Sequence, residues 1–588
     1  MFVRLKKTPK SKNPTVQVVE SKRIGTKIQQ KVIVSLGVLR DESDRERMIQ
    51  LGQVIIAKLA REQEEQNPQL TLAAPDADEE YDENGVSRPR TVQGELPVHP
   101  SNLIHVRTET CGFSEVFGRI FKNMGFTDIL NVAEKSSKST FNTSEIIRAL
   151  VVRRIQDPAS KRRSFFLEAT ERGHLAHDIQ HIYRAMDVLL PYEEIIKTAA
   201  HHASADLLKG EVECFFYDAT TLFFESIAED ELKAFGFSKD GKFNQVQLLL
   251  CLIVTREGLP MGYEVFPGNT SEKTTLDAAL KKLGMRYKVA GHTVVADRGI
   301  LSQNNMDVIS SHKMYFIMGE RLRGLAKKHH ESILDLNQYA SVGKQDEFFI
   351  RDIPHPSRGE GVRLILGYSK DRAKKDKIDR ERLLEKLKKK LAKKKKTEPK
   401  ELISNRGVLK FLKATGGEVQ FNSEAIATDE RWDGFFGIAT NHPTLSSSEI
   451  LSQYRGLWQV EAQFRVYKHN LEARPIYHLT PNRIRAHVLI CFMALCLERH
   501  LEVGLKKIGV AVTTTNIHDA LNGCQAIHMQ DKKSHRMFRM SSNKSEEAKQ
   551  IYRAVGLSPR SKTIELERPQ GLVVPTTHSV KPQLYGIA

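Results

Sequence analysis

The hydrophobic and polar positions along this chain change their period several times, and each change marks an expected element. Residues 15–37 alternate apolar and polar side chains on both sides of a charged turn containing glycine, which predicts a β-hairpin. Residues 43–64 follow as a predicted helix, whereas residues 65–100 lack periodicity and predict an exposed linker. We therefore expect a hairpin-plus-helix module over residues 1–64.

Residues 101–210 have a helical pattern, with apolar side chains three and four positions apart in segments such as TSEIIRALVVRRIQD. The stretch RRIQDPASKRR (153–163) concentrates cations at the junction of two predicted helices. Such a cluster fits either contacts with DNA phosphates or a solvated turn. The pattern and the charge together predict a helical DNA-binding domain over residues 101–210.

Residues 211–320 change to strands separated by one or two helices. Three strands in succession, then helix, strand, helix and strand, predict an α/β fold whose mixed sheet carries packed helices. Residues 321–445 break this rhythm with strand-like runs around a lysine-rich segment, and they predict a β-rich insertion domain. Within it Leu383, Leu387 and Leu391 recur every four residues and predict a helix, whose lysines lie on a solvated face or contact DNA.

A long helix is predicted over residues 446–472. Ser446 followed by Glu449 is typical of a capping box, and the apolar residues that follow recur at intervals of three and four. We expect this helix and the next to complete the core over residues 446–505. Residues 506–588 then form a C-terminal segment that is a candidate for oligomer contacts.

One face of this predicted helix carries a mixture of acid, cations and tyrosine. At about 100° per residue, Tyr454, Glu461 and Lys468 fall within about 40° of one another. Arg465 lies one turn beyond Glu461, whereas Arg455 points about 120° away from it. Glu461 is therefore expected at the edge of the buried seam, where it either serves a functional site or forms a surface ion pair with Arg465.

Two further acids lie in strands that are predicted to be buried. The run FFYDATTLFFES places Asp218 among apolar and β-branched residues, and HTVVADRGI places Asp297 at the end of a strand. An unpaired carboxylate is costly in such a strand, whereas a bound metal ion offsets that cost. The end of a strand is also a common place for a functional group. A turn or helix-cap role explains one such acid equally well, but two acids favour a metal site.

The composition narrows the function and the location. The formal net charge of +18 and the pI of about 9.4 predict attraction to a polyanion, with nucleic acid the leading candidate. The six cysteines include no CxxC pair, so neither a zinc ribbon nor a disulfide framework is indicated. The apolar stretch from Val488, VLICFMALCL, is too short to span a bilayer, and residues 1–20 lack the apolar core of a signal peptide. These features predict a soluble cytoplasmic protein with no membrane partner.

The three acids resemble those of a known family. Asp218 in YDATT, Asp297 in VVADRGI and Glu461 in QVEAQFRVYKHNLE resemble the DDE catalytic acids of bacterial insertion-sequence transposases of the IS-four type. The resemblance covers most of the chain, from about residue 140 to about residue 500. It implies an RNase H-like catalytic core that is interrupted before its last helix by a β-rich insertion domain, in agreement with the break at residues 321–445.

The family has a signature of Tyr, two residues, Arg, three residues, Glu, six residues and Lys. Tyr454, Glu461 and Lys468 match it at that spacing, but Leu457 stands at the Arg position. This departure puts the phosphate contact of the missing arginine in doubt. Arg465 is the candidate to replace it by the helix geometry above.

The resemblance implies a metal-dependent phosphoryl transfer. Asp218, Asp297 and Glu461 would hold two Mg²⁺ ions, with Mn²⁺ as a substitute, because hard oxygen ligands suit hard cations. The same site would hydrolyse an element end and then direct the freed 3′-OH against target DNA. The implied partners are double-stranded DNA, as element ends and as target, and a second copy of the chain in a homodimer, in the bacterial cytoplasm at the nucleoid.

Five residues are candidates for holding phosphates beside the scissile bond: Tyr454, Arg465, Lys468, Arg298 and Arg455. For Arg298, which follows Asp297 directly, a salt bridge at a turn is an equal alternative. Trp432 is either a core residue or a platform for an unpaired base.

Two other functions remain open at the level of the sequence. A nuclease with the same core and no strand transfer would use the same three acids. A metal-free DNA-binding or repressor protein would keep the acids only as strand caps and would use its net charge for non-specific affinity.

Overall fold

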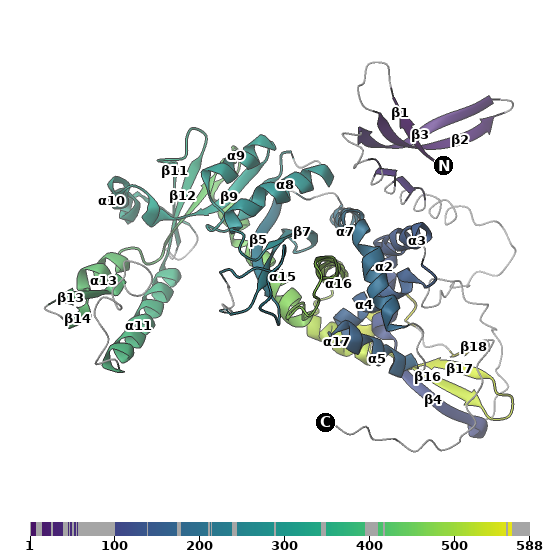
Figure 1. Ribbon diagram of the computed structural model, residues 1–588. Helices are drawn as coiled ribbons and strands as arrows, with labels where there is room; N and C mark the ends of the chain where they lie inside the picture. The colour runs from purple at the N-terminus through teal and green to yellow at the C-terminus, as the bar shows by residue number, and fades with distance from the viewer. Residues whose placement is uncertain are drawn as a thin grey trace. The chain divides into compact units, whose positions relative to one another are not determined.

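A computed structural model of the chain describes two compact units (Figure 1). One comprises Met1–Ala199, Asn470–Glu472 and His478–Ala588, and the other comprises Ala200–His469 and Ala473–Tyr477. The structure describes residues 2–7, 14–24, 27–38, the positions 45, 48–49, 52–53 and 56, and 100–566 except for 138, 173–177, 210–211, 213, 238–240, 242–243, 287–289, 343–347, 394–409, 416–417 and 560–562. The predicted linker and nearly all of the predicted helix over residues 43–64 lie outside these residues.

The first unit begins with an antiparallel sheet of β1 (Phe2–Lys6), β2 (Thr15–Ile24) and β3 (Lys27–Val38). β2 and β3 pair along their whole length, from Thr15 with Val38 to Ile24 with Lys27. This pairing confirms the hairpin that the alternating pattern predicts. The first described residues are therefore strands, positions 45, 48–49, 52–53 and 56 are helical, and the first α-helix with described bounds begins at Gly112.

Six helices follow in this unit and in the segment that leaves it. Their bounds are α2 (Gly112–Asn123), α3 (Phe126–Ser136), α4 (Thr143–Gln156), α5 (Lys161–Arg172), α6 (Ile179–Leu189) and α7 (Glu193–Leu207). Of these helices, α2, α4 and α6 contact α16 (Pro481–Lys507), which carries the apolar run from Val488. The exposed fraction of every side chain from Val488 to Leu497 is zero. α16 lies in the first unit, whereas the sequence predicts it as one of the last helices of the core over residues 446–505.

The cation cluster at residues 153–163 does not form one surface. Arg153, Arg154 and Lys161 are buried, and a guanidinium nitrogen of Arg154 donates to the carbonyl oxygen of Ala159 at 2.7 Å. Arg162 and Arg163, at the start of α5, are exposed. Only these last two are placed to meet a phosphate.

A second sheet belongs to the first unit, and it differs from the wholly helical domain that we expected over residues 101–210. It consists of β4 (Leu103–Thr110), β16 (Gln525–Asp531), β17 (Met537–Ser541) and β18 (Thr563–Leu566), accompanied by α17 (Thr514–Asn522) and α18 (Glu546–Ala554). The region over 101–210 is therefore not wholly helical, because β4 pairs with β16 from Leu103 with Asp531 to Thr110 with Gln525. The described part of the segment over 506–588, which ends at residue 566, folds as part of the same unit, since its strand β16 pairs with β4.

The second unit is built on one large mixed sheet in the order β10-β11-β12-β15-β9-β8-β5-β6-β7. Its bounds are β5 (Cys214–Phe223), β6 (Gln247–Thr255), β7 (Pro260–Pro267), β8 (Thr293–Ala296), β9 (Tyr315–Glu320), β10 (Ala340–Ser341), β11 (Phe348–Pro354), β12 (Arg363–Ser369) and β15 (Phe435–Thr440). β5, β8 and β9 are parallel, and the other neighbours are antiparallel. The sheet confirms the predicted mixed α/β core and is consistent with an RNase H-like arrangement.

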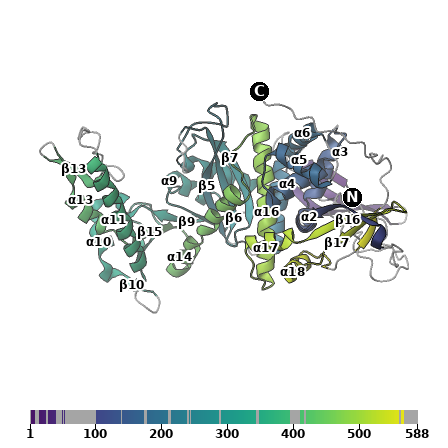
Figure 2. The same ribbon diagram turned by 90° about the horizontal axis from the view of Figure 1, so that it is seen from below.

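One face of the sheet is covered by α8 (Thr275–Arg286) and α9 (Gln303–Ser311), and Figure 2 shows α9 beside β5. The odd-numbered residues of β5, Phe215, Tyr217 and Ala219, are buried in this core with side chains of both helices. The Tyr217 hydroxyl donates to the Oγ1 of Thr275 at 2.8 Å. Because side chains alternate along a strand, the even-numbered residues of β5 face the opposite side.

The expected insertion over residues 321–445 is not a separate sheet. β11, β12 and β15 extend the core sheet through the pairing of β15 with β9. Beyond them lie α10 (His330–Leu334), α11 (Lys370–Lys393), α13 (Ser423–Glu430) and the hairpin of β13 (Leu412–Thr415) and β14 (Glu418–Phe421). α11 confirms the helix predicted from the leucine spacing. It buries Leu387 against Phe411 and Leu412.

Trp432 lies in the turn before β15 and not in a strand, and its side chain is buried beside Leu322, Leu364 and Leu366. It is therefore a core residue. All six cysteines are buried thiols. Among the described residues, no helix combines the length and the apolar character that a membrane crossing needs.

Candidate active site

Asp218 lies on the face of β5 that turns away from the α8 and α9 core. It is the single half-buried position in an otherwise buried run from Cys214 to Leu222. Its Oδ1 accepts the backbone N–H of Ala219 at 2.7 Å. The strand as a whole is buried, but the alternation of side chains directs this carboxylate toward a pocket.

Asp297 directly follows β8, as the sequence predicts, and it lies next to Asp218 along the sheet. β5 and β8 pair in parallel from Cys214 with Thr293 to Tyr217 with Ala296. The register, continued by one residue, places Asp218 beside Asp297, and neighbouring strands are about 4.8 Å apart. The Asp297 backbone carbonyl accepts the N–H of Ile300 at 3.0 Å, which turns the chain away and leaves the side chain exposed.

Glu461 lies on α15 (Trp458–Arg465), which is only part of the predicted helix over residues 446–472. The helix begins as α14 (Ser447–Arg455), with the predicted capping box between Ser446 and Glu449. It then breaks at Gly456 and ends in a π-helical turn over Val466–Asn470. The prediction of one continuous helix is therefore wrong.

Gly456, at the break, lies close to β5. A Cβ at Gly456 would lie 2.5 Å from the Cζ atom of the Phe216 ring, so the backbone of α14 and α15 approaches β5 closely there. Phe216 and Asp218 share one face of β5. α15 packs on β5 and β6 with Val460 and Phe464 buried, while the side chain of Glu461 is exposed.

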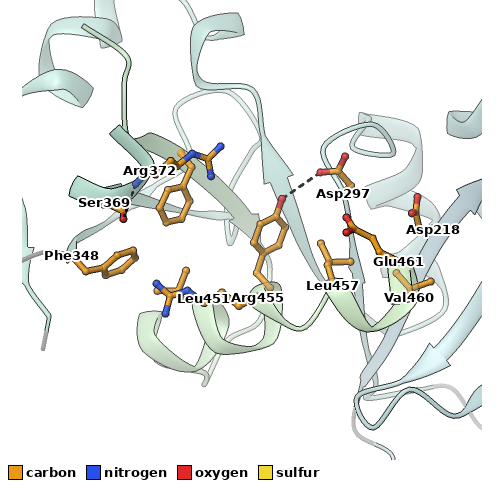
Figure 3. Close-up of a pocket in the computed structure, with 12 residues that line it drawn as sticks. Asp218, Asp297, Phe348, Ser369, Arg372, Leu451, Arg455, Leu457, Val460 and Glu461 are labelled. Carbon is orange, nitrogen blue, oxygen red and sulfur yellow. Dashed lines mark hydrogen bonds between the residues drawn. The ribbon is translucent and has the colours of Figure 1, made fainter. Parts of the chain in front are cut away.

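The three acids line one pocket of about 350 Å³. Figure 3 shows the carboxylates of Asp297, Glu461 and Asp218 gathered at one end, with Phe348, Ser369 and Arg372 at the other. The complete lining consists of Asp218, Asp297, Phe348, Ser369, Arg372, Phe436, Leu451, Tyr454, Arg455, Leu457, Val460 and Glu461. Three acids from distant parts of the chain thus meet at one place.

The donor set suits a divalent cation in its chemistry, because carboxylate oxygens are the ligands that Mg²⁺ prefers. In the arrangement shown, however, the described residues contain no group of three or more His, Cys, Asp or Glu side chains that is positioned to hold a metal ion. Asp297 and Glu461 are exposed. Joint coordination of a cation would need other rotamers of these side chains.

Tyr454 links α14 to Asp297. Its hydroxyl forms a long hydrogen bond, 3.5 Å, to the Oδ1 of Asp297. Burial raises the pKa of Tyr454 to about 12, and the Asp297 carboxylate adds to the rise, while Arg372 and Arg298 oppose it. The tyrosine is therefore a neutral hydrogen-bond donor at any ordinary pH, and it orients Asp297.

Gly319 makes room for this tyrosine, and sequence reasoning overlooked it. The residue lies on β9, next to the strand that leads to Asp297. A Cβ at this position would collide with the Tyr454 hydroxyl oxygen and would lie 3.2 Å from the backbone nitrogen and the Cβ of Arg298. The glycine in the run KMYFIMGE, at the end of a buried strand, was the available signal.

The five predicted phosphate contacts divide into two groups. Tyr454 and Arg455 line the pocket, and Arg298 contributes to the electrostatic environment of Tyr454. Arg465 is exposed at the end of α15, and Lys468 lies in the π-helical turn, and neither lines the pocket. Regular helix geometry does not continue past Val466, so the predicted alignment of Lys468 with Glu461 does not place the lysine there.

Four further lining residues come from the expected insertion and were not predicted: Phe348, Ser369, Arg372 and Phe436. The N–H of Arg372 is donated to the Ser369 Oγ at 3.4 Å, where β12 passes into α11. Only the continuity of β11, β12 and β15 with the core sheet brings them to the acids. No local pattern in the sequence indicates this.

Comparison with known proteins gives a family for this region. Residues 212–497 match the family described as "Transposase DDE domain". No curated protein matches the chain. Among solved structures, the chain is similar to one described as "Cryo-EM structure of piggyBac transposase synaptic complex with hairpin DNA", with a TM-score of 0.34 and 10% identity over 69% of this chain and 77% of that chain.

Proposed function

We propose that this chain, whose residues 212–497 form a transposase DDE domain and which is accordingly a phosphoryl-transfer enzyme, cleaves DNA at insertion-sequence ends and transfers the freed 3′-OH to target DNA. The observation that carries the proposal is the meeting of Asp218, Asp297 and Glu461 at one pocket. These acids come from a strand, a strand end and a helix. They are the only carboxylates among the lining residues that the structure describes.

The three acids are the residues that would hold Mg²⁺ or Mn²⁺. Two such cations, when bound, would lower the pKa of the attacking water or 3′-OH and neutralise charge on the leaving 3′ oxygen. Asp218 and Asp297 are carried by adjacent parallel strands, so their spacing is set by the sheet. Glu461 lies on α15, which packs on β5 and β6.

Other groups of the chain position the acids and the DNA. Tyr454 donates its hydroxyl proton toward Asp297 and so restricts the rotation of that carboxylate. Arg298, directly after Asp297, and Arg455, at the other end of the pocket, supply N–H groups for phosphate oxygens. No covalent enzyme intermediate is required, so one site serves hydrolysis and strand transfer in turn.

Within the DDE transposases, we assign this chain to the IS-four type. Tyr454, Glu461 and Lys468 have its spacing, and Leu457 departs from it. Because Arg465 and Lys468 lie outside the pocket lining, we assign them to phosphates farther along the DNA. A homodimer is part of the proposal, because joining two element ends to one target requires two active sites.

The experiment is incubation of the purified chain with Mg²⁺ and a labelled duplex that carries the inverted repeat flanking the coding region. Cleaved ends joined to a target plasmid support transposition. Cleavage without joined product supports the alternative of a nuclease with the same acids. Absence of both, with DNA binding retained, supports a metal-free DNA-binding protein and contradicts the proposal.

The acids themselves provide the first prediction. Asp218→Asn, Asp297→Asn and Glu461→Gln should each abolish Mg²⁺-dependent cleavage, because each removes a negative oxygen ligand. Binding to the end duplex should stay close to that of the unmodified chain. Gel assays of cleavage and fluorescence anisotropy of binding measure the two effects, and cleavage by all three variants would contradict the assignment.

A further inference from the structure

The end of the pocket opposite the acids is formed by two arginines and two phenylalanines. The Arg455 guanidinium lies 4.6 Å from the centre of the Phe348 ring, and the Arg372 guanidinium lies 5.3 Å from the centre of the Phe436 ring. The two rings are 5.9 Å apart and tilted by 37°. The four side chains form one continuous group, which we call the arginine–phenylalanine stack. Figure 3 shows Arg372, Phe348 and Arg455 on the side of the pocket away from Asp218.

The sheet explains how the two rings meet. Phe348 lies on β11 and Phe436 on β15, and β12 runs between these strands. The residue of β12 that pairs with Phe436 is Gly367. A Cβ there would collide with the Phe436 ring, so the ring lies across the glycine and reaches toward Phe348. The position of the rings that support both arginines therefore depends on the missing side chain at Gly367.

The two guanidinium groups have little neutralising charge around them. Arg455 is exposed and forms no ion pair with any residue that the structure describes. Arg372 has a side chain that is 48% exposed, and its ion pair with Asp376 is long, at 3.9 Å, and also exposed. Such a pair contributes little. A guanidinium that rests on a ring face still presents its N–H groups at its edge, where an anion can accept them.

We infer that the arginine–phenylalanine stack is a phosphate-binding site for the DNA strand whose scissile bond lies at the acids. This inference rests on the proposed function, because it takes the acid end of the pocket as the place of reaction. The stack would hold backbone phosphates near that bond through Arg372 and Arg455. The two rings serve as rigid supports, since their faces are already covered by each other and by the arginines, and a base would have to displace these groups to stack.

Substitution together with removal of single phosphate charges tests the site. The variants are Arg372→Ala and Arg455→Ala, and the probe is the end duplex with one methylphosphonate linkage, moved stepwise along the strand. In the unmodified chain, one or two neutral linkages near the scissile bond should lower affinity about tenfold, as expected for one charge-assisted contact. In each variant, one of these linkages should have no further effect, because its partner is already absent.

Arg382→Ala is the matched control. Arg382 lies on α11 as Arg372 does, its side chain is 73% exposed, and it pairs with Asp379 at 3.8 Å, but it does not line the pocket. This variant should keep the full methylphosphonate pattern. Thermal unfolding of all variants at the same temperature as the unmodified chain shows that the fold is retained.

The outcomes separate this inference from the proposed function. Cleavage by the unmodified chain, with both arginine variants as sensitive to the neutral linkages as Arg382→Ala, overturns the phosphate site and leaves the proposed function standing. Loss of the pattern in the variants, without cleavage by the unmodified chain, supports the phosphate site and overturns the proposed function. A duplex with an abasic nucleotide near the bond that binds more weakly than every methylphosphonate duplex shows base stacking and overturns the inference.

Discussion

A space the size of one methyl group decides where the Tyr454 hydroxyl lies. Gly319 on β9 provides that space, and the hydroxyl then reaches the Asp297 carboxylate. Gly367 provides a similar space for the Phe436 ring. At both positions the missing Cβ admits an aromatic side chain over a strand, and both aromatic groups line the pocket. The geometry of the site thus depends on residues that have no chemistry of their own.

Gly319→Ala should displace Tyr454 and loosen Asp297. The added Cβ meets the tyrosine oxygen and the backbone of Arg298, and relief of such overpacking costs about 1–3 kcal/mol. Because a small misplacement of a reacting group is costly, cleavage should fall by up to about a hundredfold, with DNA binding little changed. Single-turnover cleavage and anisotropy measure the two effects.

Gly324→Ala is the control for this change, because its Cβ would have its nearest neighbour at an ordinary 3.7 Å. Its activity should stay within about twofold of the unmodified chain. Equal activity of the two variants would show that the space beside Tyr454 is not required.

At the scale of elements, α14 and α15 hold Glu461 through their contact with β5. The close approach at Gly456 brings the helix pair against Phe216, two residues before Asp218 on the same strand face. One contact therefore links the positions of two of the three acids. α16 shows a different case, since it is buried over most of its length and yet carries Glu498.

Gly456→Ala should lift α15 from the sheet. Its Cβ would lie 2.5 Å from the Phe216 ring, so we expect a loss of about 1–3 kcal/mol in the free energy of unfolding and a lower cleavage rate. Gly504→Ala on α16, where no atom lies within 4 Å of the added Cβ, should be neutral or stabilising by up to about 1 kcal/mol. Urea unfolding of the two variants, side by side, distinguishes them, and equal losses would contradict the steric explanation.

Glu498 should make the stability of its unit depend on pH. Burial raises its pKa from 4.5 to about 8, and Glu502 adds to the rise. Neither carboxyl oxygen has a hydrogen-bond partner among the described residues. Between about pH 4.5 and pH 8, Glu498 stays protonated in the folded chain but is ionised in the unfolded chain. Because the unfolded chain therefore binds fewer protons at this group, the free energy of unfolding falls as the pH rises through this range.

Glu498→Gln should remove this dependence, because the amide does not ionise. The variant should be more stable than the unmodified chain at pH 8 by a few kcal/mol, and the difference should shrink toward pH 5. Thermal unfolding across this range measures it. A difference that is the same at both pH values would show that Glu498 does not titrate as described.

For the whole molecule, the net charge of +18 is the property that a DNA partner meets first. It is distributed unevenly among the described residues. α11 carries many exposed lysines and starts at the pocket with Ser369 and Arg372, while three of the five cations in residues 153–163 are buried. Affinity for DNA should therefore fall steeply with salt, as phosphate contacts require.

Lys468→Ala tests one contact outside the pocket. If Lys468 meets a single phosphate, the slope of log K against log salt should become less steep by about one, and affinity should fall alike for all DNA sequences. Arg465→Ala should behave in the same way. Anisotropy titrations over a range of salt concentrations measure the slope, and an unchanged slope would remove these residues from the interface.

Local features of this chain were predictable because short-range forces determine them. The alternation over residues 15–37 specifies a hairpin, Ser446 and Glu449 specify a helix start, and the strand runs around Asp218 and Asp297 specify two buried strands that carry acids. The match of residues 212–497 to a transposase DDE domain agrees, at that general level, with the resemblance that the three acids indicated.

Only the tertiary structure decided which distant segments meet. It pairs β4 with β16, extends the core sheet through β15 into the expected insertion, and breaks the helix at Gly456. It also brings Arg372 and Phe436 to the pocket of the acids. The physical reason is that these contacts join residues that lie far apart in the chain, such as a strand and its partner or a glycine and the ring beside it. The periodicity of the sequence shows only which face of an element is buried, and not what covers that face.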